Sequence, residues 1–334
     1  MLNPDAKLSD KVFAADIPKA PTRDGFGKGS VEAGKKDERI VVLSADLAES
    51  TRAEWFKKEF PERFVEVGVA EQNMATIAAG MAACDKIPFI TSYAAFSPGR
   101  NYEQIRTTIA LNNVPVKVCG MHAGVSVGPD GATHQMLEDV AMMRALPNMI
   151  VVIPADAEEA RKATYAAAFT GKPAYLRFGR DKVATFTTPE TPFEIGKAYY
   201  LWKPEKPDVA IIGAGHLVYE ALLAAKALEA KGIKASVINS HTVKPLDEAT
   251  IVAAAEEAGA IVTVEEHQVA GGFGSAVAEL LALKHPTPIE FVGVKDKFGQ
   301  SGEPDELIHH YELDAEAIEK AAQTVLKRKN ARGA

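Results

Sequence analysis

The chain has 334 residues, of which 47% are apolar and 25% are charged, and its formal net charge is −7. This length and composition are typical of a globular protein with about two domains, and the acidic balance argues against nucleic acid as a partner. The only cysteines, Cys84 and Cys119, lack metal-ligand spacing, which argues against a disulfide or zinc framework. No apolar run is long enough for a signal peptide or a membrane span, so we predict a cytoplasmic protein with no membrane partner.

Residues 1–20 contain prolines and mixed charges, and we predict that they form an arm that wraps a partner. From residue 21 onward, short β-branched runs alternate with helical patterns. The predicted strands are residues 40–47, 64–67, 88–93, 114–120, 149–153 and 174–178, and the predicted helices are residues 25–34, 53–59, 71–84, 101–112, 134–145 and 157–170. This alternation predicts a mostly parallel sheet covered by helices on both faces, in a first domain of residues 21–184.

A proline-rich, irregular stretch at residues 185–207 predicts an interdomain linker. A second alternation follows it, with strands predicted at residues 208–215, 235–240, 260–267 and 289–294, and helices at 217–231, 247–258, 273–284 and 314–329. We therefore predict the α/β fold class, with two doubly wound sheets and a second domain of residues 208–334. Neither a phosphate loop of the Walker type nor a complete dinucleotide fingerprint occurs in the sequence.

Glu71 opens the predicted helix 71–84 directly after a short strand. From these residues alone, its carboxylate either complements the helix dipole or serves a ligand. The loop at residues 91–102 follows another strand and presents Tyr93 and Phe96. Aromatic rings beside a carboxylate can form a flat apolar slot with one acidic group, which suits a planar nitrogen heterocycle.

The loop at residues 119–135 is rich in glycine and carries His122, Asp130 and His134. These groups can bond sugar hydroxyls and move protons near neutral pH, and ligands of open α/β sheets bind where such loops leave the strands. Three further polar residues flank predicted elements and could hold a phosphate, with surface ion pairs as the alternative for the two arginines. They are Arg23, Ser50 and Arg177.

Three segments resemble the transketolases, which are thiamine-diphosphate enzymes. They read SADLAEST at residues 44–51, GVAEQNM at 68–74 and HAGVSVGPDGATHQMLEDVAMMRALPN at 122–148. The resemblance runs from Thr22 to the C-terminus and covers the pyrimidine-binding and C-terminal domains only, since the GDG motif of the diphosphate-binding domain is absent. It therefore implies a split transketolase that is active only with a partner chain, in a heterotetramer of two copies of each chain. The partner chain then holds the diphosphate and Mg²⁺ or Ca²⁺, and this chain holds no metal.

The resemblance also implies an activity, namely reversible transfer of a two-carbon ketol group from a ketose phosphate to an aldose phosphate, as in the pentose phosphate pathway. It implies three catalytic residues: Glu71, which bonds N1′ of the cofactor's aminopyrimidine, and the proton-transferring His122 and His134. The residues implied to border the cofactor, besides Glu71, are Phe96, Tyr93 and Asp46. Those implied to bind the sugar phosphate are Arg23, Ser50, His122, Asp130, His134 and Arg177.

Two other thiamine-diphosphate enzymes stay open as alternatives. Deoxyxylulose-phosphate synthase shares the Glu71 helix, but it typically has aspartate at the position of His122 and is a fused chain. The β subunit of a 2-oxo acid dehydrogenase has a similar length, but its loop usually lacks the histidine found here as His134. A catalytically inactive scaffolding relative is disfavoured because Glu71, His122, Asp130 and His134 are all present.

Overall fold

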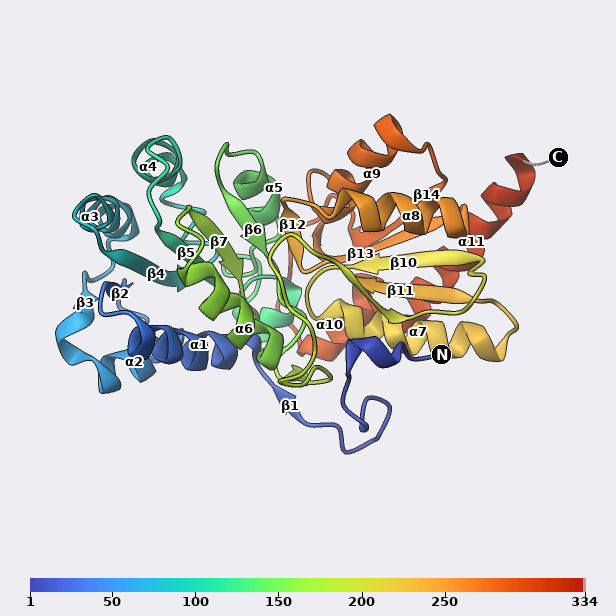
Figure 1. Cartoon of the computed structure of the whole chain (residues 1–334), viewed down its shortest axis with the longest axis horizontal. Helices are drawn as coiled ribbons and strands as arrows, with labels where there is room; N and C mark the ends of the chain where they lie inside the picture. Colours follow the sequence, from blue (N-terminus) through green and yellow to red (C-terminus); the bar gives the residue numbers. More distant parts are fainter. Residues whose placement is uncertain (333–334) are drawn as a thin grey trace.

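Two α/β units lie next to each other in the computed structural model, which describes residues 1–332 (Figure 1). The first unit is built on a seven-stranded sheet with the order β12-β6-β7-β5-β4-β2-β3. Its strands are β2 (Ile40–Ser44), β3 (Phe64–Glu66), β4 (Ile87–Tyr93), β5 (Lys117–Met121), β6 (Ile150–Val152), β7 (Ala174–Arg177) and β12 (Thr242–Lys244). Neighbouring strands pair in parallel except β12, which is antiparallel to β6.

Both faces of this sheet are buried, because successive side chains of a strand point to opposite faces and each face carries helices. On one face, Ile40 and Val42 belong to a core with helices α1 (Thr22–Lys36), α2 (Ala53–Glu59) and α6 (Ala157–Ala168). On the other face, Val41 and Leu43 belong to a core with α3 (Glu71–Ala83), α5 (Asp139–Arg144) and the π-helix η3 (Ile105–Ala110). The short helix α4 (Tyr102–Gln104) leads into η3.

The second unit has a five-stranded sheet with the order β14-β13-β10-β11-β9. Its strands are β9 (Tyr199–Trp202), β10 (Val209–Gly213), β11 (Ala235–Asn239), β13 (Ile261–Gln268) and β14 (Ile289–Val294), and only β9 runs antiparallel to its neighbour. Helices α7 (Leu217–Ala230) and α11 (Ala315–Arg332) cover one face, whereas α8 (Glu248–Ala258) and α9 (Phe273–Lys284) cover the other. The predicted α/β fold class with two doubly wound sheets is confirmed.

Several segments tie the two units together. Strand β12 lies between second-unit elements in the sequence but extends the first sheet. The predicted linker 185–207 contains β9, which forms the edge of the second sheet. The predicted arm, whose strand β1 (Lys19–Ala20) is labelled in Figure 1, pairs that strand with β8 (Val183–Ala184). Its apolar residues pack into the second unit's core, where the Phe13 ring lies edge-on to Trp202. In this chain the arm therefore lies on its own second unit, and the domain boundaries stay a prediction.

Across residues 1–332, no helix has both the length and the apolar character needed to cross a membrane.

Candidate functional site

The predicted site residues gather where the parallel strands β2, β3, β4 and β5 end. Because these strands run in the same direction, the segments that follow them emerge at one edge of the sheet. The segment after β2 carries Asp46 and Ser50, α3 begins with Glu71 after β3, and the segment after β4 carries Phe96. His122 follows β5 directly.

Glu71 is a buried carboxylate at the first position of α3. Its Oε1 accepts a hydrogen bond from the Ser92 hydroxyl at 3.3 Å, and its Oε2 accepts one from Nη1 of Arg100 at 2.7 Å. The side chain is only 1% exposed. Nδ2 of Asn101 donates to the Glu71 carbonyl at 3.0 Å, which ties the helix start to the loop after β4. The carboxylate is therefore held in one orientation between α3 and β4.

Aromatic rings form a wall beside this carboxylate. Tyr93 stacks on His122 with 3.9 Å between ring centroids and on Phe96 with 5.8 Å. His134 meets the edge of this stack, 5.5 Å from Phe96 at an interplanar angle of 73°. Tyr93, Phe96 and His134 are half-buried, so the wall has access to solvent. A flat ring can lie against such a surface with an edge directed at an acidic group.

His122 is held neutral in a strained backbone conformation. Its φ is 53°, in the left-handed region, and the residue is 1% exposed. Nε2 lies 3.3 Å from Nη1 of Arg23, and a guanidinium can only donate, so Nε2 accepts and the ring proton sits on Nδ1. Burial, with the positive charges of Arg23, Arg180 and Arg52, lowers the pKa of His122 to about 2. Nδ1 has no partner among the described residues and is therefore free to donate to a ligand.

We expect His122→Asn to make folding stability less sensitive to acid. The pKa of His122 is depressed from 6.5 to about 2, so the unfolded chain binds the extra proton between these values and stability falls as pH falls below 6.5. Wild type should therefore lose roughly 2 kcal/mol more free energy of unfolding between pH 7 and pH 5 than the variant, which lacks the ring. Asparagine tolerates the left-handed backbone.

Denaturant titrations of wild type and variant at both pH values measure this difference. His310→Asn, at an exposed position of α10 (Pro304–His310), serves as the control. An identical loss of stability in wild type and His122→Asn would show that the ring is not buried as a neutral group.

Arginine side chains surround His122 and make this end of the site positive. Nη1 of Arg23 donates to the Ser50 carbonyl at 2.7 Å, while its buried Nε has no partner among the described residues. Burial and the nearby charges of Arg52 and Arg180 lower the pKa of Arg23. Nη1 of Arg180 donates to the Val127 carbonyl at 2.8 Å and lies 3.4 Å from the Asp130 carboxylate. A concentration of guanidinium groups of this kind favours an anion.

Arg177 lies apart from this cluster, in the core. Its Nε donates to Oδ2 of Asp139 at 2.8 Å, and Nη2 donates to the carbonyls of Met136 and Glu266. The residue is 6% exposed, and its contact with the Glu266 carbonyl joins the first unit to β13 of the second, whereas Asp139 and Met136 belong to the first unit. Arg180 was not predicted from the sequence; its position on the segment that follows β7 is the signal that would have found it.

The remaining predicted residues lie on exposed or half-exposed turns. Asp46 has an exposed side chain and a left-handed φ of 60°, and its N–H donates to Oε1 of Glu66 at 2.7 Å. Asp130 is exposed and faces Arg180. Nδ1 of His134 lies 2.9 Å from the Thr133 hydroxyl. None of these contacts buries the side chain, so each remains accessible to a ligand or a neighbouring chain.

The second unit closes over the loop that carries His134. Nε2 of Gln135 donates to the carbonyls of Val125, Gly128 and Gln300, and Gln300 belongs to the second unit. A Cβ atom on Gly299 would lie 1.7 Å from Oε1 of Gln135, so a side chain at this position would require Gln135 to move. The loop conformation, and with it the position of His134, therefore depends on both units.

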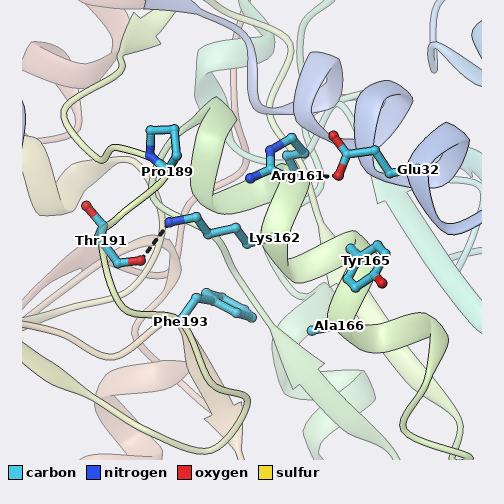
Figure 2. Close-up of a pocket in the computed structure, with 8 residues that line it drawn as sticks. All are labelled: Glu32, Arg161, Lys162, Tyr165, Ala166, Pro189, Thr191 and Phe193. Atoms are coloured by element: carbon cyan, nitrogen blue, oxygen red, sulfur yellow. Dashed lines mark hydrogen bonds and ion pairs between the residues drawn. The ribbon is translucent and has the colours of Figure 1, made fainter. Parts of the chain in front are cut away.

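Another hollow of about 600 Å³ lies away from this edge, lined by residues of α1, α6 and the segment 189–193 (Figure 2). Its two cations are already engaged. Arg161 pairs with Glu32 at 2.6 Å, and Nζ of Lys162 donates to the carbonyls of Thr188 and Thr191 at 2.6 Å. The hollow therefore has fewer unpaired polar groups available to bind a ligand than the Glu71 edge.

Comparison with known proteins settles the family. Residues 18–185 match the transketolase pyrimidine-binding domain, and residues 196–318 match the transketolase C-terminal domain. This chain belongs to the transketolase family.

Its relatives within that family include separate C-terminal chains. A protein of Methanocaldococcus jannaschii named "Putative transketolase C-terminal section" is 43% identical over 92% of this chain and 96% of its own. The 6-deoxy-6-sulfo-D-fructose transketolase subunit SqwH of Clostridium sp. strain MSTE9 is 41% identical over 93% and 96% of the two chains. A solved structure described as a split gene transketolase, an inactive beta4 tetramer, superposes with a TM-score of 0.86 at 44% identity, over 92% of this chain and 99% of that one. The resemblance to the C-terminal half of a split transketolase is confirmed.

Transketolases use thiamine diphosphate, and the Glu71 edge fits the pyrimidine half of that cofactor. A buried carboxylate lies beside the half-buried rings of Phe96 and Tyr93, and the buried Nδ1 of His122 lacks a partner. Among residues 1–332, no cluster of three or more histidine, cysteine or acidic side chains has the arrangement to hold a metal ion.

Proposed function

We propose that this chain is the C-terminal subunit of a transketolase, which transfers a two-carbon ketol group reversibly from a ketose phosphate to an aldose phosphate. The observation that carries the proposal is the buried Glu71 carboxylate beside the Tyr93–Phe96 stack, in a chain that matches only two transketolase domains. A partner chain would supply the diphosphate-binding domain with its Mg²⁺ or Ca²⁺.

Each site residue of this chain has a role that follows from its position. When bound, thiamine diphosphate supplies the electron sink for breaking the carbon–carbon bond of the sugar. Glu71 would hold a proton between its carboxylate and N1′ of the pyrimidine, against which Phe96 and Tyr93 would pack. Neutral His122 would donate its Nδ1–H to a substrate hydroxyl, and the more accessible His134 would take and return a proton.

The arginines would bind the charged end of the substrate. Arg23 and the Ser50 turn are already joined by a hydrogen bond of 2.7 Å, and Arg180 faces the same region with Asp130. We assign the phosphate contact to Arg180 instead of Arg177, because the Arg177 guanidinium already donates hydrogen bonds to Asp139 and two carbonyls. Asp130 would meet a sugar hydroxyl, and exposed Asp46 would lie near the cofactor and the subunit contact.

The assembly we propose contains two copies of this chain and two of the partner. The similar solved structure, which is an inactive tetramer of beta chains, supports a requirement for a second kind of chain. The relative that acts on a sulfo sugar is also a subunit, and a guanidinium cluster can bind a sulfonate or a phosphate. The cytoplasmic location and a place in the pentose phosphate pathway stay predictions.

Reconstitution tests this function. We expect the isolated chain to show no ketol transfer between xylulose 5-phosphate and ribose 5-phosphate, since the diphosphate site is missing, and the complex recovered by pull-down from the native source to show it. Each chain assayed alone, with thiamine diphosphate and Mg²⁺, is the control. Full activity of the isolated chain would contradict the split-enzyme proposal.

A further inference from the structure

Arg100 makes two contacts at the centre of the site. Its Nη1 donates to Oε2 of Glu71 at 2.7 Å, and its Cζ lies over the Phe96 ring, 4.8 Å from the centroid. The Arg100 side chain is 47% exposed, whereas the Glu71 side chain is 1% exposed. The guanidinium therefore lies on the solvent side of the carboxylate and covers one aromatic face.

A guanidinium group and an aminopyrimidine offer the same two surfaces. Each is planar, each presents N–H groups along an edge, and each can lie flat on an aromatic ring. The contacts that Arg100 makes are the two that the proposed function gives to the pyrimidine, namely the Glu71 carboxylate and the Phe96 ring. Two planar groups cannot occupy the same carboxylate oxygen and ring face together.

The pair also has a physical reason to form. A buried carboxylate without a partner is strongly destabilising, and the other hydrogen bond that Glu71 accepts, from Ser92, is long at 3.3 Å. Arg100 therefore supplies the charge that Glu71 needs in a chain without cofactor. Its long side chain can leave by rotating about its own bonds toward solvent, without any change in the loop backbone.

We propose that Arg100 is a stand-in for the cofactor's pyrimidine ring, which occupies Glu71 and Phe96 in the cofactor-free chain and is displaced when the cofactor binds. This inference rests on the proposed function. This role of Arg100 can be distinguished from others by experiment. A group that the ligand displaces stabilises the free protein and weakens ligand binding by the same free energy. A residue that holds the cofactor would strengthen binding, and a residue that only supports the fold would stabilise both states.

Two variants, Arg100→Gln and Arg100→Ala, test the proposal with two measurements. The first is thermal unfolding of the isolated chain without cofactor, where we expect a lower Tm for both. The second is calorimetric titration of thiamine diphosphate with Mg²⁺ into the complex with the partner chain, where we expect about tenfold tighter binding, from the usual strength of a hydrogen bond to a charged group. Arg106→Gln is the control, since Arg106 is exposed on η3 and makes no ion pair within residues 1–332.

A double-variant cycle identifies the partner of Arg100. In a Glu71→Gln background the cofactor-free chain has no buried charge at this position, so Arg100→Gln should then leave Tm unchanged. Weaker or unchanged cofactor binding by the Arg100 variants overturns the stand-in role while leaving the proposed function intact. A complex that binds no thiamine diphosphate, with or without Arg100, overturns both.

Discussion

Glu71→Gln should lower kcat of the reconstituted complex by about 10³-fold, the scale of losing a positioned acid–base group. Glutamine keeps the size of glutamate and can still bond a ring nitrogen, but it cannot exchange a proton with it. Glu71 is 1% exposed and accepts a hydrogen bond from Ser92, so no water or neighbouring carboxylate takes its place easily. Steady-state kinetics with xylulose 5-phosphate and ribose 5-phosphate measure the change.

The matched control for this variant is Glu49→Gln, at an exposed position in the turn after β2. Both proteins should keep the wild-type circular dichroism spectrum and form the complex with the partner chain. If Glu71→Gln turned over near the wild-type rate, the carboxylate would have no part in proton transfer and the helix-dipole interpretation would stand.

Arg177→Met should lower the free energy of unfolding by about 3–5 kcal/mol, because it leaves a buried charge without its partner. Asp139 is fully buried, and burial raises its pKa, yet the charge of Arg177 and hydrogen bonds from Arg177 and Tyr175 bring that pKa below its usual value. Methionine fills much of the space but offers no donor. Denaturant unfolding near neutral pH, where the Asp139 carboxylate needs its partner, measures the loss.

Arg180→Met is the contrasting control, because Arg180 is 38% exposed and its ion pair with Asp130 is long at 3.4 Å. We expect it to change stability by less than about 1 kcal/mol, as surface pairs do, and to raise KM for sugar phosphates in the complex. The reverse pattern, in which Arg177→Met is stable and loses only phosphate affinity, would restore the role that the sequence predicted for Arg177.

The sequence predicted the order of elements and the loops that carry the site. The alternation of β-branched runs with alanine-rich helical stretches indicates buried strands covered by helices. Two doubly wound sheets could therefore be expected from the sequence. Glu71 at a helix start after a strand, and His122 directly after another, then lie at one edge of the sheet by topology alone.

Element boundaries near the site were less accurate for a physical reason. The predicted helix 134–145 begins only at Asp139, since Gln135 is bound to carbonyls of its own loop and to Gln300 of the second unit. The proline-rich segment 185–207 has its own strand β9, whose hydrogen-bonding partner β11 lies more than thirty residues further along the chain. Contacts of this range leave no local pattern.

By itself, therefore, the sequence determined which residues could do chemistry and on which loops they stand. Only the tertiary structure decided which of them have free groups. Arg177 and Arg180 are three residues apart, yet Arg177 is bound to the buried Asp139, whereas Arg180 faces Asp130 at the site. Arg100, one more polar residue in the sequence, proved to be the partner of Glu71. Ion pairs form between side chains that packing brings together from distant segments, and hydrophobic periodicity along one segment carries no record of them.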